Sequence, residues 1–123
     1  MASDQIANYL QVLRRKSGFS QNELALVLGI VTESQLSRHE RSVGAPGLLA
    51  ALAYEALFHK PVSEIFPGFY RTVSAGIEER LDRLEQLLQE SSVRGHKAAV
   101  IARKLEFMWE RRNIEPPHAT EIL

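Results

Sequence analysis

The chain has 123 residues and a hydrophobic share of 45%, which is too apolar for a disordered chain and enough for one compact domain plus an accessory element. It contains no cysteine, no apolar run near the roughly 18 residues of a membrane span, and no secretory pattern in its first ten residues; a cytoplasmic protein without disulfides or thiolate metal sites is expected. Its 15 basic and 15 acidic side chains balance, also within residues 1–70 and 71–123, so any surface for a polyanion must be local.

The first predicted helix ends at Gly18. Apolar side chains recur before it at intervals of three and four residues, which places them on one helical face: Ile6, Tyr9, Leu10 and Leu13. The preceding run "RRKS" is basic, as is typical of a helix C-terminus, where cations interact favourably with the helix dipole. The cations expected near a local basic surface are Arg14, Arg15, Lys16, Arg38 and Arg41.

Two more helices are predicted, with only a short turn between them. Ser20 and Glu23 form a capping-box pattern at the start of the second helix. Thr32 and Gln35 repeat this pattern at the start of the third, which is expected over residues 32–41. The inner face of the second helix is expected to hold Leu24, Ala25 and Leu28 before Gly29 ends it. Ile30 and Leu36 are expected to close a small core between the two helices.

The next two segments are also expected to be helical. "PGLLAALAYEALFHK" predicts a fourth, mostly buried helix, and "PVSEIF" predicts a short fifth one. No stretch alternates apolar and polar residues between turn signals, so strands are not expected. The fold class predicted is therefore all-α.

The C-terminal part has a different pattern, and "FPGFY" is interpreted as a boundary. A helix is expected from about Arg71 to Glu90, with a heptad-spaced seam of Ile77, Leu81, Leu84 and Leu88. After a break at "SSVRG", the segment "HKAAVIARKLEFMWERRN" predicts another helix. The domain organisation expected is a first domain at 1–69, a helical oligomerisation region at 70–113 and a flexible tail at 114–123.

Residues 9–66 resemble the phage Cro/repressor (Xre-type) helix-turn-helix family. "GFSQNELALVLGI" follows that family's pattern Gly-hydrophobic-Ser/Thr-Gln-x-Glu-Leu-Ala-x-x-x-Gly-Val, and "LSRHER" resembles its Ile-Ser-x-x-Glu-x segment. The fourth and fifth predicted helices agree with the family in length and apolar spacing. The resemblance covers about half the chain and implies a five-helix DNA-binding domain whose third helix enters the major groove.

The resemblance also implies roles for individual residues. Gln21 corresponds to a phosphate-contacting position at a helix N-terminus. Arg38 is suited to guanine, Gln35 to adenine and Glu33 to cytosine. The full set of expected DNA-contacting residues is Gln21, Thr32, Glu33, Ser34, Gln35, Ser37, Arg38 and Arg41. Arg14 and Glu40 correspond to an ion pair that ties the first helix to the third. Ser20 and Thr32 are first of all expected to be helix caps. For the other exposed polar residues, the alternative to contacting DNA is that they are simply solvated surface residues.

The sequence departs from the family pattern in two places. The stretch from Gly29 to Leu36 is one residue longer than usual, and the extra residue is expected near Val31, in the turn. His59 stands where a C-cap glycine is common, so it either adopts a left-handed conformation or ends the fourth helix differently.

The C-terminal helices are expected to form a coiled-coil-like or hairpin dimerisation region. Two heptads alone make a weak coiled coil, so the second of these helices is expected to fold back or to swap into a four-helix assembly. The residues expected at the dimer contact are Ile77, Leu81, Leu84, Leu88, Ile101, Leu105, Met108 and Trp109. Two domains held one DNA turn apart by two-fold symmetry can read a palindrome.

The function expected from the sequence is a homodimeric, sequence-specific transcriptional regulator that binds double-stranded DNA, most simply a repressor. One alternative is an antitoxin or interaction module whose C-terminal helices bind a protein partner. Another is a helix-turn-helix scaffold that has lost DNA binding, which the even charge balance favours. No nucleophile–base pattern or phosphate-binding glycine loop predicts an enzyme, and the four histidines share no metal-ligand spacing, so no cofactor or metal is expected.

Overall fold

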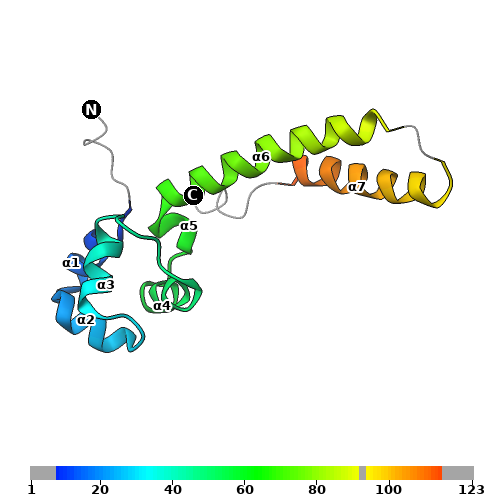
Figure 1. Cartoon of the computed structure of the whole chain (residues 1–123). Helices are drawn as coiled ribbons and strands as arrows, with labels where there is room; N and C mark the ends of the chain where they lie inside the picture. Colours follow the sequence, from blue (N-terminus) through cyan, green and yellow to red (C-terminus); the bar gives the residue numbers. More distant parts are fainter. Residues whose placement is uncertain (1–7, 92–93, 115–123) are drawn as a thin grey trace. The chain divides into compact units, whose positions relative to one another are not determined.

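The computed structural model describes residues 8–91 and 94–114, and all regular structure within these ranges is helical. The helices are α1 (Leu10–Ser17), α2 (Gln21–Leu28), α3 (Glu33–Glu40), α4 (Leu48–Phe58), α5 (Val62–Ile65), α6 (Pro67–Gln89) and α7 (His96–Arg112) (Figure 1). The all-α fold class is confirmed. Of the helices in the described ranges, none combines the length and the apolarity that crossing a membrane requires. The predicted tail lies outside the described residues, apart from Ile114.

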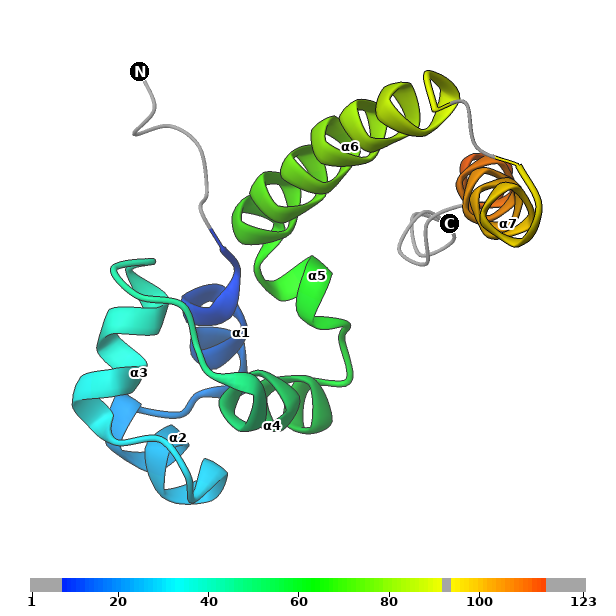
Figure 2. The same cartoon turned by 45° about the vertical axis from the view of Figure 1, so that its right-hand side comes forward.

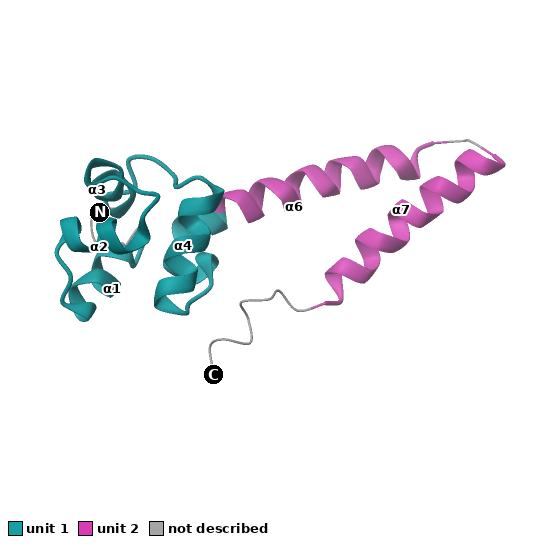
Figure 3. Ribbon diagram, turned by 90° about the horizontal axis from the view of Figure 1, so that it is seen from below, with its two compact units in different colours: residues 1–71 teal, residues 72–123 magenta. Residues whose placement is uncertain are grey.

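The chain divides into two compact units between Arg71 and Thr72 (Figure 3). The helix expected from about Arg71 begins earlier, at Pro67. Proline suits the first position of a helix, because the N–H that it lacks would have no partner there. The backbone N–H of Tyr70 donates to the carbonyl of Phe66 at 3.1 Å. "FPGFY" therefore contains the start of α6, and the division between the two compact units follows it within that helix.

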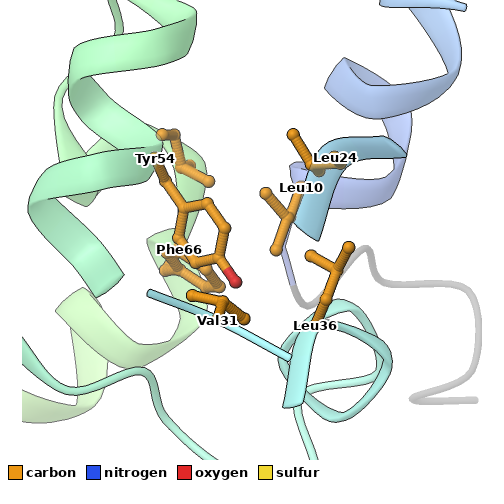
Figure 4. Packing of buried hydrophobic residues seen from close by; sticks show 7 residues of the cluster. Leu10, Leu24, Val31, Leu36, Tyr54 and Phe66 are labelled. Carbon is orange, nitrogen blue, oxygen red and sulfur yellow. The ribbon is translucent and has the colours of Figure 1, made fainter. Parts of the chain in front are cut away.

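The core of the first unit takes buried side chains from each of its helices. These residues are Leu10, Leu24, Val31, Leu36, Tyr54, Ile65 and Phe66. Figure 4 shows Leu10, Leu24 and Leu36 on one side of the core, facing Tyr54 and Phe66 on the other. Helices α1, α2 and α3 are thereby held against α4 and α5 (Figure 2).

The turn between α2 and α3 differs from the prediction. Ile30 was expected in the core, but it is 52% exposed, whereas Val31 is 6% exposed. Gly29 ends α2 with a φ of 77°, Ile30 follows on the surface, and Val31 turns inward directly before the N-cap Thr32. Val31 therefore takes the core position that was expected of Ile30. A residue before an N-cap commonly packs against the fourth residue of the helix, which here is Leu36.

Helix α4 is much less buried than predicted. Tyr54 alone is fully buried, and Leu48, Leu49 and Leu52 are exposed. The expectation of a mostly buried helix was wrong because apolar composition does not say how many faces of a helix find neighbours. The helix ends at His59, which adopts the left-handed conformation with a φ of 55°. Of the two endings considered for this departure from the family, the structure has the left-handed one.

In the second unit, α6 and α7 form an antiparallel hairpin (Figures 1 and 3). Ion pairs join Arg111 to Glu78, with 2.6 Å between the charged atoms, and Arg112 to Glu85. Met108 is buried, while the other seam residues on the side of the hairpin are half-buried: Leu81, Leu88, Ile101 and Leu105. Ile77, Leu84 and Trp109 are exposed. The interhelical contact therefore leaves part of the predicted seam open to solvent.

Candidate nucleic-acid interface

Both helices of the helix-turn-helix begin with a complete capping box. In α2, the backbone N–H of Glu23 donates to Ser20 Oγ at 3.1 Å, and the N–H of Ser20 donates to Glu23 Oε1 at 2.9 Å. In α3, the N–H of Gln35 donates to Thr32 Oγ1 at 3.1 Å, and the N–H of Thr32 donates to Gln35 Oε1 at 3.0 Å. These bonds satisfy helix N-terminal donors and so define where each short helix starts.

A side-chain contact links the first turns of α2 and α3. Asn22 Nδ2 donates to Glu33 Oε2 at 3.3 Å, and both side chains are exposed. The carboxylate of Glu33, which was expected to face a base, is therefore oriented by a residue of the preceding helix. Asn22 was not singled out from the sequence, because nothing in the sequence pattern pairs it with Glu33.

Glu40 holds three helices together at the other end of α3. Its carboxylate accepts hydrogen bonds from Arg14 Nε at 2.5 Å, Arg14 Nη2 at 3.1 Å and Gln21 Nε2 at 3.0 Å. The bond to Glu40 raises the pKa of the Arg14 guanidinium, which also donates to the carbonyl of Phe19 at 3.0 Å. Gln21, expected at a phosphate, thus already donates to Glu40, and the charge of Arg14 is matched within the domain.

Asn8, which precedes α1, binds the C-terminus of α3 through its side chain. Its Nδ2 donates to the carbonyl of His39 at 3.0 Å and to Ser42 Oγ at 2.6 Å, and its Oδ1 accepts from the N–H of Leu10 at 2.9 Å. The side chain is 7% exposed. The sequence offered only an asparagine just before a helix as a signal, and its partners on α3 lie more than thirty positions away.

His39 and Tyr54 connect α3 to α4. His39 Nδ1 and the Tyr54 hydroxyl share a hydrogen bond of 2.7 Å, and the two rings meet edge to face with centroids 5.9 Å apart. Burial, with a further contribution from the charge of Arg38, lowers the pKa of His39. Burial likewise raises the pKa of Tyr54, so the pair is neutral near pH 7.

The face of α3 that remains exposed is polar. Ser34, Arg38 and Arg41 lie on it, since their spacing of four and three residues is that of one helical face. The Arg38 guanidinium lies beside Gly44, with Nη2 3.6 Å from where a Cβ of Gly44 would be. Thr32, Glu33 and Gln35 are exposed on the first turn, and Ser37 is half-buried.

The structure brings the predicted DNA-contacting residues together around α3, but several are already engaged. Thr32 and Gln35 bond each other's backbones, so a base contact by Gln35 Oε1 competes with its cap. Arg38 and Arg41 are exposed cations toward the C-terminal end of α3, whereas its first turn carries the acidic Glu33, which agrees with a local rather than a general positive surface. In residues 8–91 and 94–114, no group of three acidic, His or Cys side chains is arranged to hold a metal ion.

Residues 6–65 match the family model described as "Helix-turn-helix". No curated protein and no solved structure matches the chain. The matched segment begins before α1 and ends with α5, so it contains every contact described above for α2 and α3 and none of the α6–α7 hairpin.

Proposed function

We infer that this protein is a sequence-specific transcriptional repressor. The basis is that the chain belongs, through residues 6–65, to the Cro/C1-type family of DNA-binding helix-turn-helix regulators. In this proposal it acts as a homodimer on a palindromic operator. A cytoplasmic location, where a regulator meets DNA, belongs to the same proposal.

The observation that carries the proposal is that side-chain hydrogen bonds fix α3 at both ends. Capping by Thr32 defines its start, and Asn8 and Glu40 hold its end, so the helix is fixed at both termini. Between them, Ser34 and Arg38 are exposed, and neither belongs to the hydrophobic core of the domain. A rigid helix that presents a polar face is what readout of base edges in the major groove requires.

Individual roles follow from the chemistry of the exposed side chains. Arg38 is assigned to guanine, whose O6 and N7 accept two parallel hydrogen bonds from a guanidinium. Glu33 is assigned to cytosine N4, with Asn22 holding the carboxylate. Ser34 and the free amide hydrogens of Gln35 are assigned to neighbouring base edges. The residues assigned to phosphate contacts are Gln21, Ser37 and Arg41.

Dimerisation supplies the affinity for DNA that a single domain lacks. The chain has equal numbers of acidic and basic side chains, so non-specific attraction to DNA is weak. Linking two domains converts the second binding event into an intramolecular one and raises the affinity by orders of magnitude. The α6–α7 hairpin, with its partly open apolar seam, is proposed to provide this link.

The proposal is tested by selecting DNA that the full-length protein retains from a random library, followed by titration of the selected duplex. We expect a palindromic consensus, and an affinity that falls steeply with salt as several phosphate contacts are lost. Retention of unrelated duplexes with the same affinity, or no binding at all, would overturn it.

The alternative function is an antitoxin-like or interaction module, and the exposure of two aromatic side chains favours it. Phe107 and Trp109 of α7 are 61% and 62% exposed, and aromatic residues are enriched in protein interfaces. A stoichiometric protein that copurifies with the wild type and is lost from Trp109→Ala would support this alternative. In that case the first unit would still bind the operator.

A further inference from the structure

The apolar side chains of α6 spread over two neighbouring faces of the helix, and α7 covers only one of them. Leu81 and Leu88 lie on the covered face and are half-buried. A second set lies about a quarter turn away, at roughly 100° per residue. This α6 stripe consists of Val73, Ile77, Leu84 and Leu87, which are 57%, 39%, 42% and 60% exposed.

We propose that the α6 stripe is the docking site for a second copy of this chain, with the two α6 helices antiparallel. The inference rests on the proposed function, because it says how the homodimer is built. It differs from a general expectation of dimerisation by naming one helix face, one orientation and the residues that meet across the two-fold axis.

The stripe is complementary to itself when read in the opposite direction. Val73 lies seven residues before Arg80, and Leu87 lies seven residues after it. An antiparallel pair centred near Arg80 therefore places Val73 opposite Leu87 of the second copy. It also places Ile77 opposite Leu84, and the two-fold axis repeats both contacts. Each exposed apolar side chain of the stripe thereby gains an apolar neighbour.

The charged flank of the stripe selects the same orientation. Glu79 and Arg83 lie beside the stripe, on the side away from α7, and form an exposed ion pair of 3.0 Å within their own helix. In an antiparallel helix pair, identical flanks face each other, so Glu79 faces Arg83 of the second copy, twice. In a parallel pair this flank would instead face the flank that α7 occupies, where Arg111 and Arg112 bind acidic residues.

Arg80 carries the charge nearest the proposed axis, and its side chain points away from that axis along its own helix. The guanidinium nitrogens of Arg80 lie 3.0 and 3.1 Å from where a Cβ of Gly76 would be. The side chain therefore folds back along its own helix, over a residue that has no side chain. Two Arg80 residues that meet at the axis can thus keep their guanidinium groups apart.

The antiparallel orientation also suits two DNA half-sites. Helix α6 begins at Pro67, thirteen residues before Arg80, which corresponds to about 20 Å of helix. The two starts of α6 are then about 40 Å apart, which is comparable with the ~34 Å between successive half-sites. A parallel pair would instead begin both helices about 8–10 Å apart.

Single cysteines test the orientation, because the chain has no cysteine of its own. Full-length Val73→Cys, Arg80→Cys and Leu87→Cys are oxidised separately and as a mixture of the first and third, and disulfide-linked dimers are measured on non-reducing gels. Arg103→Cys, exposed on α7, controls for random collision. A disulfide needs Cα atoms within about 7 Å, whereas two copies of position 73 in the antiparallel pair are about 21 Å apart.

We expect Arg80→Cys to form linked dimers, Val73→Cys and Leu87→Cys to remain unlinked alone, and their mixture to link. Self-linkage at all three positions would show a parallel pair. Linkage no higher than that of Arg103→Cys would show that a second copy does not dock at the α6 stripe. This conclusion holds whether the wild type sediments as a dimer or as a monomer. Each of these results would overturn the inference. Retained binding of the wild type to its selected DNA would then show that the proposed function stands without it.

Discussion

The Arg14 guanidinium and the Glu40 carboxylate form a two-bond ion pair that joins α1 to the end of α3. Their side chains are 11% and 2% exposed, and the carboxylate also accepts a hydrogen bond from Gln21. A paired, nearly buried carboxylate of this kind is costly to disrupt from one side, because the remaining charge keeps its burial and loses its partner. The position of α3, and with it the face that is proposed to contact DNA, depends on this contact.

Replacing Glu40 with alanine should therefore be strongly destabilising. We expect Glu40→Ala to lower the free energy of unfolding by about 3–5 kcal/mol, measured by urea denaturation followed by circular dichroism. The matched control is Glu106→Ala, the same change at an exposed position of α7, which should cost less than about 0.5 kcal/mol. Similar losses in the two variants would contradict a structural role for the Arg14–Glu40 pair.

The two residues of the α2–α3 turn should respond differently to truncation. Val31→Ala removes two buried carbon atoms and should cost about 2 kcal/mol of unfolding free energy. Ile30→Ala acts on an exposed side chain and should change the unfolding free energy by less than about 0.5 kcal/mol. The same denaturation experiment measures both. A larger loss of stability in Ile30→Ala than in Val31→Ala would contradict the burial of Val31 in this turn.

Asn8 should be important although it contacts no DNA in the proposal. Asn8→Ala leaves the carbonyl of His39 without its side-chain donor, and we expect a loss of about 1–3 kcal/mol in unfolding free energy. Asn22→Ala is the control, since it removes an exposed hydrogen bond to Glu33 and should leave stability nearly unchanged. Equal stability of the two variants would argue against Asn8 as the anchor of α3.

Stability should fall in mildly acidic solution because of His39. Burial and Arg38 lower its pKa in the folded protein, so the unfolded chain takes up a proton at a higher pH than the folded chain does. The free energy of unfolding is therefore expected to decrease as the pH drops below about 6.5. His39→Gln, which does not titrate, should lose less stability than the wild type between about pH 7 and 5.5. Identical pH profiles would exclude His39 as the cause.

Local patterns were enough to predict most of the helix-turn-helix. The capping residues Ser20 and Thr32 start α2 and α3 where the sequence places them, because a cap acts within its own turn. The all-α class and the family followed from the same motifs. The start of α6 at Pro67 was missed, because proline and glycine were interpreted as a break although proline also fits the first turn of a helix.

Contacts between distant segments were harder to predict. The neighbours of Asn8 and the orientation of Glu33 by Asn22 depend on tertiary structure, which helical periodicity does not encode. The fourth helix was expected to be mostly buried because of its apolar composition, yet its Leu48 and Leu49 are exposed to solvent. The roles of the exposed α3 residues remain predictions, since they depend on a partner molecule.

The most direct test of the central claim is the affinity of the full-length protein for its selected DNA, compared between Arg38→Ala and the wild type. Arg103→Ala, the same change at an exposed position of α7, is the control, and circular dichroism verifies that all three proteins are folded. We expect Arg38→Ala to weaken specific binding by about 1–3 kcal/mol and to relax discrimination at one base pair of each half-site, with Arg103→Ala unchanged. Equal affinity and equal base preference in all three proteins would contradict sequence readout by α3.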